Sequence, residues 1–217
     1  RRGYKQVWRS NMSIREEPRV STDYVGEDFT SVTFTPDLPR LGMVCLEDDI
    51  VSLMRRRAYD IAATTRGRCK VYLDGELLDV KSFEDYIGLF VGSEEFRFSE
   101  ACNSRWEVGV SLTDGSGFQQ VSFVNSIYTS RGGTHVNYVT DQVVTALLED
   151  LAKQKGGTLT VKPQHVKSHL FIFVNCLIEN PAFDSQTKET MTSKKERFGS
   201  TCELSAELLQ AVRESGV

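Results

Sequence analysis

The sequence has few of the residues that mark metal centres, disulfide scaffolds and membrane proteins. Its five cysteines are scattered over 217 residues, and no two of them form a Cys-x-x-Cys pair. An odd number at this spacing argues against a zinc site or a disulfide framework and favours a reducing compartment. No apolar run approaches the length that spans a bilayer, and no signal peptide is visible. We therefore expect a soluble protein that has neither a metal site nor a membrane partner.

An excess of positive charge is also lacking. The formal net charge is −4, from 26 Lys and Arg against 30 Asp and Glu. This balance argues against a module that is basic all over, although it leaves room for a local basic patch. A length of 217 residues suffices for one large or two small domains. The chain opens with Arg1 and not with Met, so we expect it to be a piece of a longer protein.

Two strands and one helix are predicted in the first third of the chain. β-branched and aromatic residues predict strands at 4–12 and 29–35. Acidic residues at 47–49 suit a helix N-terminus, and Arg66-Gly67 suits its end. Within this helix Arg55 to Arg57 cannot all point one way. A solvated face with salt bridges explains them better than a DNA contact does. The helix carries one apolar stripe, formed by Ile50, Leu53, Met54, Ala58 and Ile61.

The middle of the chain predicts further strands and a long helix. The turn residues Asp74-Gly75 predict a hairpin within 69–80. Ser82 and Asp85 predict a capped short helix that buries apolar side chains. Strands are predicted at 105–112 and 118–128. A long helix should start at a Thr134 cap and stop at Gly156-Gly157. The residues that the short helix is expected to bury are Phe83, Tyr86, Ile87 and Phe90.

A strand followed by a polar loop dominates the last third. Residues 170–179 are apolar on both faces, which is typical of a strand buried from both sides. Asn180-Pro181 should stop that strand. The polar residues 184–189 then place a lysine at the end of a rigid strand, where its cation could meet a phosphate. On residue chemistry alone, a solvated connection is the more common explanation of such a loop. A short helix with Pro163 in its first turn and a closing helix capped by Ser205 complete an α+β or α/β order of elements.

Four segments resemble eukaryotic type IIA DNA topoisomerases. They are FVNCLIENPAFDSQTKE at 173–189, FVNSI at 123–127, GGTHVNY at 132–138 and DDIVSLMRRRAYDI at 48–61. The first three are similar to the transducer domain and the fourth to the last helix of the ATPase domain. The resemblance implies an α+β fold in which residues 1–68 are the end of a GHKL (Bergerat-type) ATPase sandwich. Residues 69–217 would form a ribosomal-protein-like βαβ transducer domain.

The same resemblance implies a nucleotide-sensing site. In the family, the loop that matches Gln186-Thr187-Lys188 contacts the γ-phosphate of ATP, and Gln186 and Lys188 would make that contact. Asp184, Ser185 and Thr187 would support the loop. Lys188 would act as an electrostatic sensor and not as a proton-transfer base. No catalytic residue is expected in this chain, because the magnesium ligand and the water-activating carboxylate lie earlier in the family's order.

The implied parent protein is an ATP-hydrolysing topoisomerase that passes one DNA duplex through another, as in relaxation and decatenation. Its cofactors would be ATP and Mg²⁺, and its partners DNA and a second copy of the ATPase region. It would work in the nucleus or in a DNA-containing organelle, and this piece alone would lack ATPase and cleavage activity. The alternatives are a nucleic-acid-binding or interaction module of the same fold and another GHKL-class ATPase.

Three weaker candidates complete the survey of side chains. A basic group near the loop could touch DNA phosphates, although Glu189 and Glu196 weaken that interpretation. His165 and His169 have the spacing of two metal ligands, but no third ligand completes them. His135 is best explained as a structural residue. The basic group consists of Lys194, Lys195 and Arg197.

Overall fold

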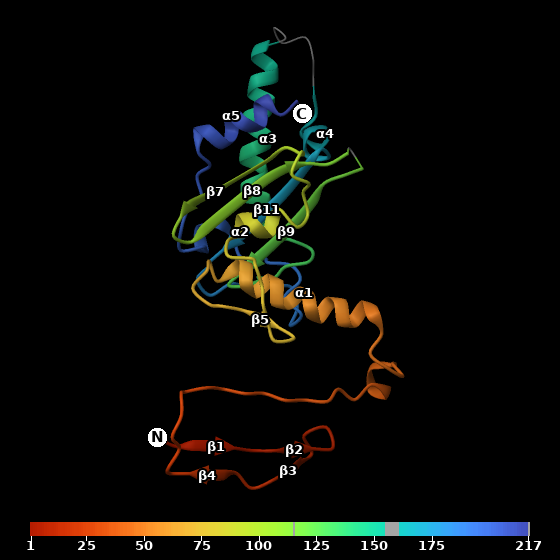
Figure 1. Ribbon diagram of the computed structural model, residues 1–217. Coiled ribbons are helices and arrows are strands. Elements are labelled where there is room, and N and C mark those ends of the chain that lie inside the picture. The colour runs from red at the N-terminus through yellow and green to blue at the C-terminus, as the bar shows by residue number, and fades with distance from the viewer. Residues whose placement is uncertain (115, 155–160, 217) are drawn as a thin grey trace. The chain divides into compact units, whose positions relative to one another are not determined.

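The computed structural model of the chain describes residues 1–114, 116–154 and 161–216. Two compact units divide the chain, residues 1–52 and residues 53–217. Helices and strands follow one another in mixed order, so the predicted α+β class is confirmed (Figure 1). No helix in the described part of the chain is long and apolar enough to cross a bilayer.

The first unit consists of two short antiparallel strand pairs and a single helical turn. The predicted strand at 4–12 is wrong in its extent, because Ser10, Asn11 and Met12 have left-handed φ angles of 51° to 68° and turn the chain. Strand β1 pairs with β4, and β2 pairs with β3. The elements are β1 Gly3–Lys5, β2 Trp8–Arg9, β3 Ile14–Arg15, β4 Arg19–Ser21 and the 3-10 helix η1 Pro39–Leu41.

The second strand predicted in this unit is not formed. Residues 29–35 have no assigned secondary structure, and Phe29 and Phe34 are 73% and 74% exposed. A strand needs a neighbour that accepts and donates its backbone hydrogen bonds, and none of the described residues pairs with this segment. High β-propensity is therefore insufficient here.

Helix α1, Asp48–Thr64, begins in the first unit and ends in the second. Its predicted apolar stripe is present, but Leu53, Met54 and Ile61 are 42–46% exposed. The buried residues are instead the polar and small side chains of the last turns, among them Ala63. Small side chains allow the end of the helix to lie close to the aromatic cluster of the second unit.

The second unit contains a five-stranded sheet in the order β10-β9-β11-β8-β7. Its central strand β11 is antiparallel to β8 and parallel to β9, and six of its seven residues are buried, as predicted for a strand covered on both faces. The predicted strand at 118–128 is two strands, because Asn125 and Ser126 adopt φ angles of 52° and 63° and reverse the chain. The strands are β7 Arg97–Asn103, β8 Trp106–Leu112, β9 Gln119–Val124, β10 Ile127–Tyr128 and β11 Leu170–Cys176.

Helices cover both faces of this sheet, and α3 connects the parallel strands β9 and β11 (Figure 1). One face packs Trp106 and Val108 against α3 and α5, and the other packs Phe123 and Phe173 against α2 and the end of α1. The predicted hairpin is confirmed as β5 and β6. The elements are β5 Tyr72–Leu73, β6 Glu76–Leu77, α2 Phe83–Ile87, α3 Thr134–Gln154, α4 Pro163–Lys167, η2 Lys195–Arg197 and α5 Ala206–Glu214.

The capping predictions are mostly confirmed. Ser82 and Asp85 form a capping box on α2, and Ser205 caps α5 by accepting from the Leu208 amide. Phe90, expected to be buried, is 39% exposed, because it lies beyond the last residue of α2 and contacts the sheet with one side of its ring. The predicted stop at Gly156-Gly157 lies outside the described residues.

Candidate functional site

The candidate site is the loop 184–189, which follows β11. Asn180, with a left-handed φ of 44°, and Pro181 turn the chain out of the sheet. The two arms of the loop then pair, because the Asp184 amide donates to the Thr190 carbonyl at 3.2 Å and the Thr192 amide donates to the Ala182 carbonyl at 2.9 Å. The loop is therefore closed at its base before its tip begins.

The N-terminus of α3 anchors the returning arm of the loop. The Met191 amide donates to the Gly132 carbonyl at 3.0 Å, and the Thr134 amide donates to the Met191 carbonyl at 3.1 Å. Gly133 has φ 139°, and a Cβ atom at this position would collide with the Met191 backbone. The Thr134 hydroxyl donates to the Ser193 carbonyl, so its predicted role as a helix cap is wrong. The segment 132–134 thus anchors the returning arm of the loop through hydrogen bonds.

Contacts within the tip fix its shape. The Ser185 and Thr187 hydroxyls lie 2.7 Å apart, and the Lys188 amide donates to the Ser185 carbonyl at 3.1 Å. A hydrogen bond from the Thr190 side chain lowers the pKa of Asp184, which keeps that exposed carboxylate ionised. The predicted supporting residues therefore do lie in the loop and bond to one another or to its base.

Lys188 is the only cation in the loop, and it is half-buried in an unusual backbone conformation. Its φ is 59°, a left-handed value that is rare for residues other than glycine. Its ammonium lies 5.8 Å from the centre of the Phe183 ring. Among the residues that the structure describes, no carboxylate lies within 4.0 Å of it. Together with the exposed Gln186, it offers donors that suit an anion.

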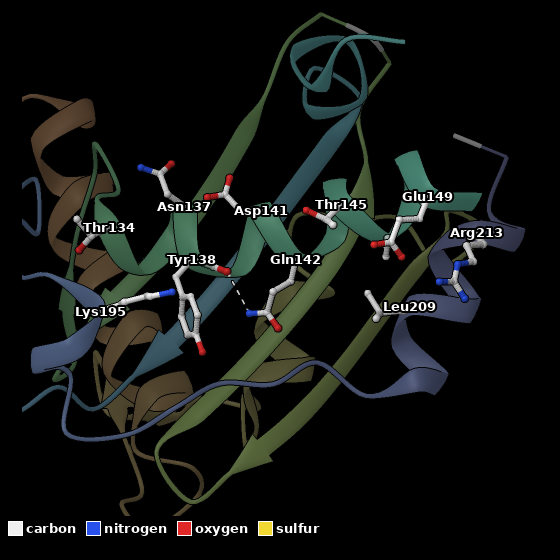
Figure 2. Close-up of a pocket in the computed structure, with 11 residues that line it drawn as sticks. Thr134, Asn137, Tyr138, Asp141, Gln142, Thr145, Glu149, Lys195, Leu209 and Arg213 are labelled. Carbon is white, nitrogen blue, oxygen red and sulfur yellow. Dashed lines mark hydrogen bonds between the residues drawn. The ribbon is translucent and has the colours of Figure 1, made fainter. Parts of the chain in front are cut away.

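The basic group next to the loop is exposed on and around η2. Lys194, Lys195 and Arg197 form no ion pair with any described residue. The Lys195 ammonium lies 5.9 Å from the Tyr138 ring centre. It lies at one end of an open groove of about 670 Å³ along α3, whose other end is closed by Leu209 and Arg213 of α5 (Figure 2). No pattern in the sequence predicted this groove.

The histidines do not assemble a site. His135, the second residue of α3, is fully buried, and its Nε2 lies 3.2 Å from the Thr129 hydroxyl. Burial lowers its pKa to about 3, so the ring is neutral at physiological pH. His165 is exposed on α4. Within residues 1–114, 116–154 and 161–216, no three His, Cys, Asp or Glu side chains gather as they would around a metal ion.

A buried polar network at the end of α1 was not predicted. The Asp60 carboxylate, 2% exposed, accepts a hydrogen bond of 2.6 Å from the Tyr86 hydroxyl. It also accepts from Arg57 at 3.1 Å and faces Arg56 at 3.8 Å. The Arg56 guanidinium in turn lies 4.4 Å from the centre of the Tyr128 ring. Arg56 and Arg57 therefore contact other residues of the second unit and do not form a free basic face.

Comparison with known proteins shows the same architecture elsewhere. The model of the DNA gyrase B family matches residues 72–215. The structure superposes on the ATPase region of Saccharomyces cerevisiae topoisomerase II with a TM-score of 0.92 and 45% identity, covering 99% of this chain and 55% of that one. The ATPase and transducer domains of topoisomerase II from Balamuthia mandrillaris give 0.85 and 41%, with 99% of this chain and 55% of the other covered. The fold is therefore that of a type II topoisomerase ATPase region.

Complete relatives identify the family more narrowly. DNA topoisomerase 2 of Bombyx mori is 48% identical over 221 residues, which cover 99% of this chain and 14% of that protein. Human DNA topoisomerase 2-alpha is 47% identical, with the same shares of each chain covered. The chain belongs to the eukaryotic DNA topoisomerase II family and corresponds to part of its ATPase region. The resemblance stated from the sequence is thus confirmed, and the chain spans about 14% of the length of the relatives it matches.

Proposed function

We propose that the loop 184–189 senses the γ-phosphate of ATP and relays the nucleotide state to the rest of a type II topoisomerase. The observation that carries this proposal is the Lys188 ammonium, which is half-buried and without a carboxylate partner among the described residues. An anion that reaches the loop can therefore bind without first displacing a salt bridge. Gln186, at the exposed tip, is the second donor.

The attachment of the loop to β11 and to the N-terminus of α3 supports a relay function. Hydrogen bonds connect its base to the N-terminus of α3, and its first arm continues directly from the central strand β11. A force on Lys188 is thus transmitted to the sheet and to a helix of 21 residues. A hydrogen bond to a charged group contributes about 1.5–3 kcal/mol. If this hydrogen bond exists in only one orientation of the domains, it shifts the equilibrium between the two orientations by about ten- to a hundred-fold.

The wider assignments are part of the same proposal and are made by analogy with the relatives. The parent protein hydrolyses ATP with Mg²⁺, acts on DNA by strand passage, and dimerises through its ATPase region, in the nucleus or a DNA-containing organelle. Residues 1–68 belong to the ATPase domain and residues 69–217 to the transducer. No residue of this chain is assigned a role in ATP hydrolysis, DNA cleavage or magnesium binding.

Substitution of Lys188 in a full-length topoisomerase II that carries this chain tests the proposal. Lys188→Met keeps the length of the side chain and removes its charge. We expect ATP turnover and strand passage to fall together by about ten- to a hundred-fold, the loss of one charged hydrogen bond. Lys81→Met is the matched control, since Lys81 is an exposed lysine whose ammonium lies 2.7 Å from Asp79 Oδ1, outside the loop. Wild-type turnover and strand passage in Lys188→Met would refute the sensor role.

The exposed cations of the basic group favour a second candidate, a nucleic-acid-binding module. Binding of the 217-residue chain to duplex DNA is measured at several salt concentrations in the absence of nucleotide. A steep fall of affinity with salt, reduced by the Lys194→Gln/Lys195→Gln variant, would support this second candidate. Binding that is absent at low salt would exclude it.

A further inference from the structure

Two cysteines that are 100 positions apart in the sequence face each other in the fold. Cys102 lies on the edge strand β7, and Cys202 lies between η2 and α5. Their sulfur atoms are 3.3 Å apart. Cys202 is fully buried, whereas Cys102 is partly exposed. The buried Cys176 provides a contrast, because its thiol donates to the Phe123 carbonyl and contacts no second sulfur.

Hydrogen bonds hold the two sulfurs in register from both sides. The Asn103 side chain donates to the Thr201 carbonyl at 2.7 Å, and the Ser205 amide donates to Glu100 Oε1 at 3.0 Å. From α3, the Gln142 side chain donates to the Cys202 carbonyl at 3.0 Å. A disulfide requires a sulfur separation of about 2 Å. The two sulfurs are therefore about 1.3 Å farther apart than in a disulfide bond.

We propose that Cys102 and Cys202 form a thiol-oxidation site, at which a low-molecular-weight disulfide such as oxidised glutathione converts them to an intramolecular disulfide. Cys102 reacts first because it is the partly exposed thiol, and its proton passes to Glu100 Oε1, 3.5 Å from its sulfur. The thiolate attacks the glutathione disulfide and releases one glutathione thiolate, which takes up that proton through water. A mixed disulfide at Cys102 results.

Cys202 then resolves the mixed disulfide. Its thiolate attacks the Cys102 sulfur, and the second glutathione leaves with the proton of Cys202. Two cysteine thiols lose two electrons and two protons, and one oxidised glutathione becomes two reduced ones. The hydrogen bond shared with Cys202, together with burial, raises the pKa of Cys102. A raised thiol pKa lowers the thiolate fraction and slows the attack on the oxidant.

The site is independent of Lys188, and it acts on a different part of the domain. The cross-link would fasten the segment that leads into α5 to the edge strand of the sheet, where α5 already contacts β7. In a reducing compartment the segment would be held by its hydrogen bonds and by the packing of Cys202 and Leu208 in the core. Oxidation would add a covalent tie between the end of this chain and its sheet.

The test uses the full chain in a Cys45→Ser/Cys69→Ser background, which removes the two exposed thiols and leaves three. After incubation with oxidised glutathione and denaturation, free thiols are counted and peptides are mapped without reductant. We expect the count to fall from three to one, with a peptide that joins Cys102 to Cys202. Cys102→Ser in this background is the matched control, and both of its remaining thiols should stay free because they are buried.

A count that stays at three, or a glutathione adduct that persists on Cys102, would overturn the proposal. Urea unfolding provides a second measurement. The cross-link closes a loop of about 100 residues, so the oxidised chain should unfold at a higher urea concentration than the reduced chain. A lower midpoint would show that the two sulfurs are not aligned for a bond.

Discussion

The Tyr86 hydroxyl donates a hydrogen bond of 2.6 Å to Oδ1 of Asp60, and both residues are at least 98% buried. Burial and the neighbouring carboxylate raise the pKa of Tyr86, so the hydroxyl keeps its proton and remains a donor. Asp60 is on α1 and Tyr86 on α2. This single bond therefore joins the helix that enters the second unit to the helix that covers one face of its sheet.

Tyr86→Phe should lower the free energy of unfolding by about 2 kcal/mol. The ring and its packing against Phe123 remain, but the buried Asp60 loses its shortest hydrogen bond, and a charged acceptor left short of a donor is costly. Urea unfolding of the full chain measures the change. Tyr72→Phe, at a 58% exposed position in the hairpin, should change stability by less than about 0.5 kcal/mol. Equal effects of the two substitutions would show that the Asp60 contact contributes nothing.

Gly133→Ala should destabilise the chain and displace the loop. A methyl group at Gly133 would collide with the backbone of Met191, whose amide and carbonyl hold the loop on α3. Gly117→Ala is a control with the same backbone strain, since its φ is 135° against 139° and no atom lies within 4 Å of its added methyl group. We expect Gly133→Ala to cost about 1–3 kcal/mol more than Gly117→Ala. Hydrogen exchange at the Met191 amide should accelerate only in Gly133→Ala.

Because of His135, the free energy of unfolding of the chain should fall as the pH is lowered. Its pKa is about 3 when folded and 6.5 in an unfolded chain. Between these values the unfolded state binds a proton that the folded state does not, so stability is complete above about pH 6.5 and falls as the pH is lowered toward 3. Between pH 7.5 and pH 5 the loss from this group is about 2 kcal/mol.

Urea unfolding of the wild type and of His135→Gln at these two pH values separates this contribution from that of the carboxylates. The wild type should lose about 2 kcal/mol more than His135→Gln over this interval, whatever the variant's stability at neutral pH. His165→Gln, at an exposed position, should keep the wild-type slope. Parallel slopes for wild type and His135→Gln would mean that the folded chain protonates His135 as readily as the unfolded chain.

Local rules predicted the elements that are determined locally. The Asp74-Gly75 turn, the Ser82 capping box and the buried strand β11 follow from a few neighbouring residues each. The segment 29–35 failed because strand formation depends on a partner that no local pattern contains. The network around Asp60 was missed for the same reason, since its partners are 26 or more positions away or were read as a charged surface. The residues of the loop were predicted from the family resemblance, whereas the contact of Met191 with Gly133 was revealed only by the structure.

At position 188 the glycine variant should be more stable than the alanine variant, which is the reverse of the usual order. In most positions glycine is the less stable of the two, because its unfolded chain has more conformational freedom. At φ 59°, however, any residue with a Cβ atom carries about 1–2 kcal/mol of strain that glycine avoids. We therefore expect Lys188→Gly to be more stable than Lys188→Ala by about 0.5–1 kcal/mol. The exposed Arg55, inside helix α1, should show alanine as the more stable of the two. If alanine is the more stable at Lys188 as well, the loop relaxes to another conformation in solution, and the strained presentation of the ammonium is not a property of the folded chain.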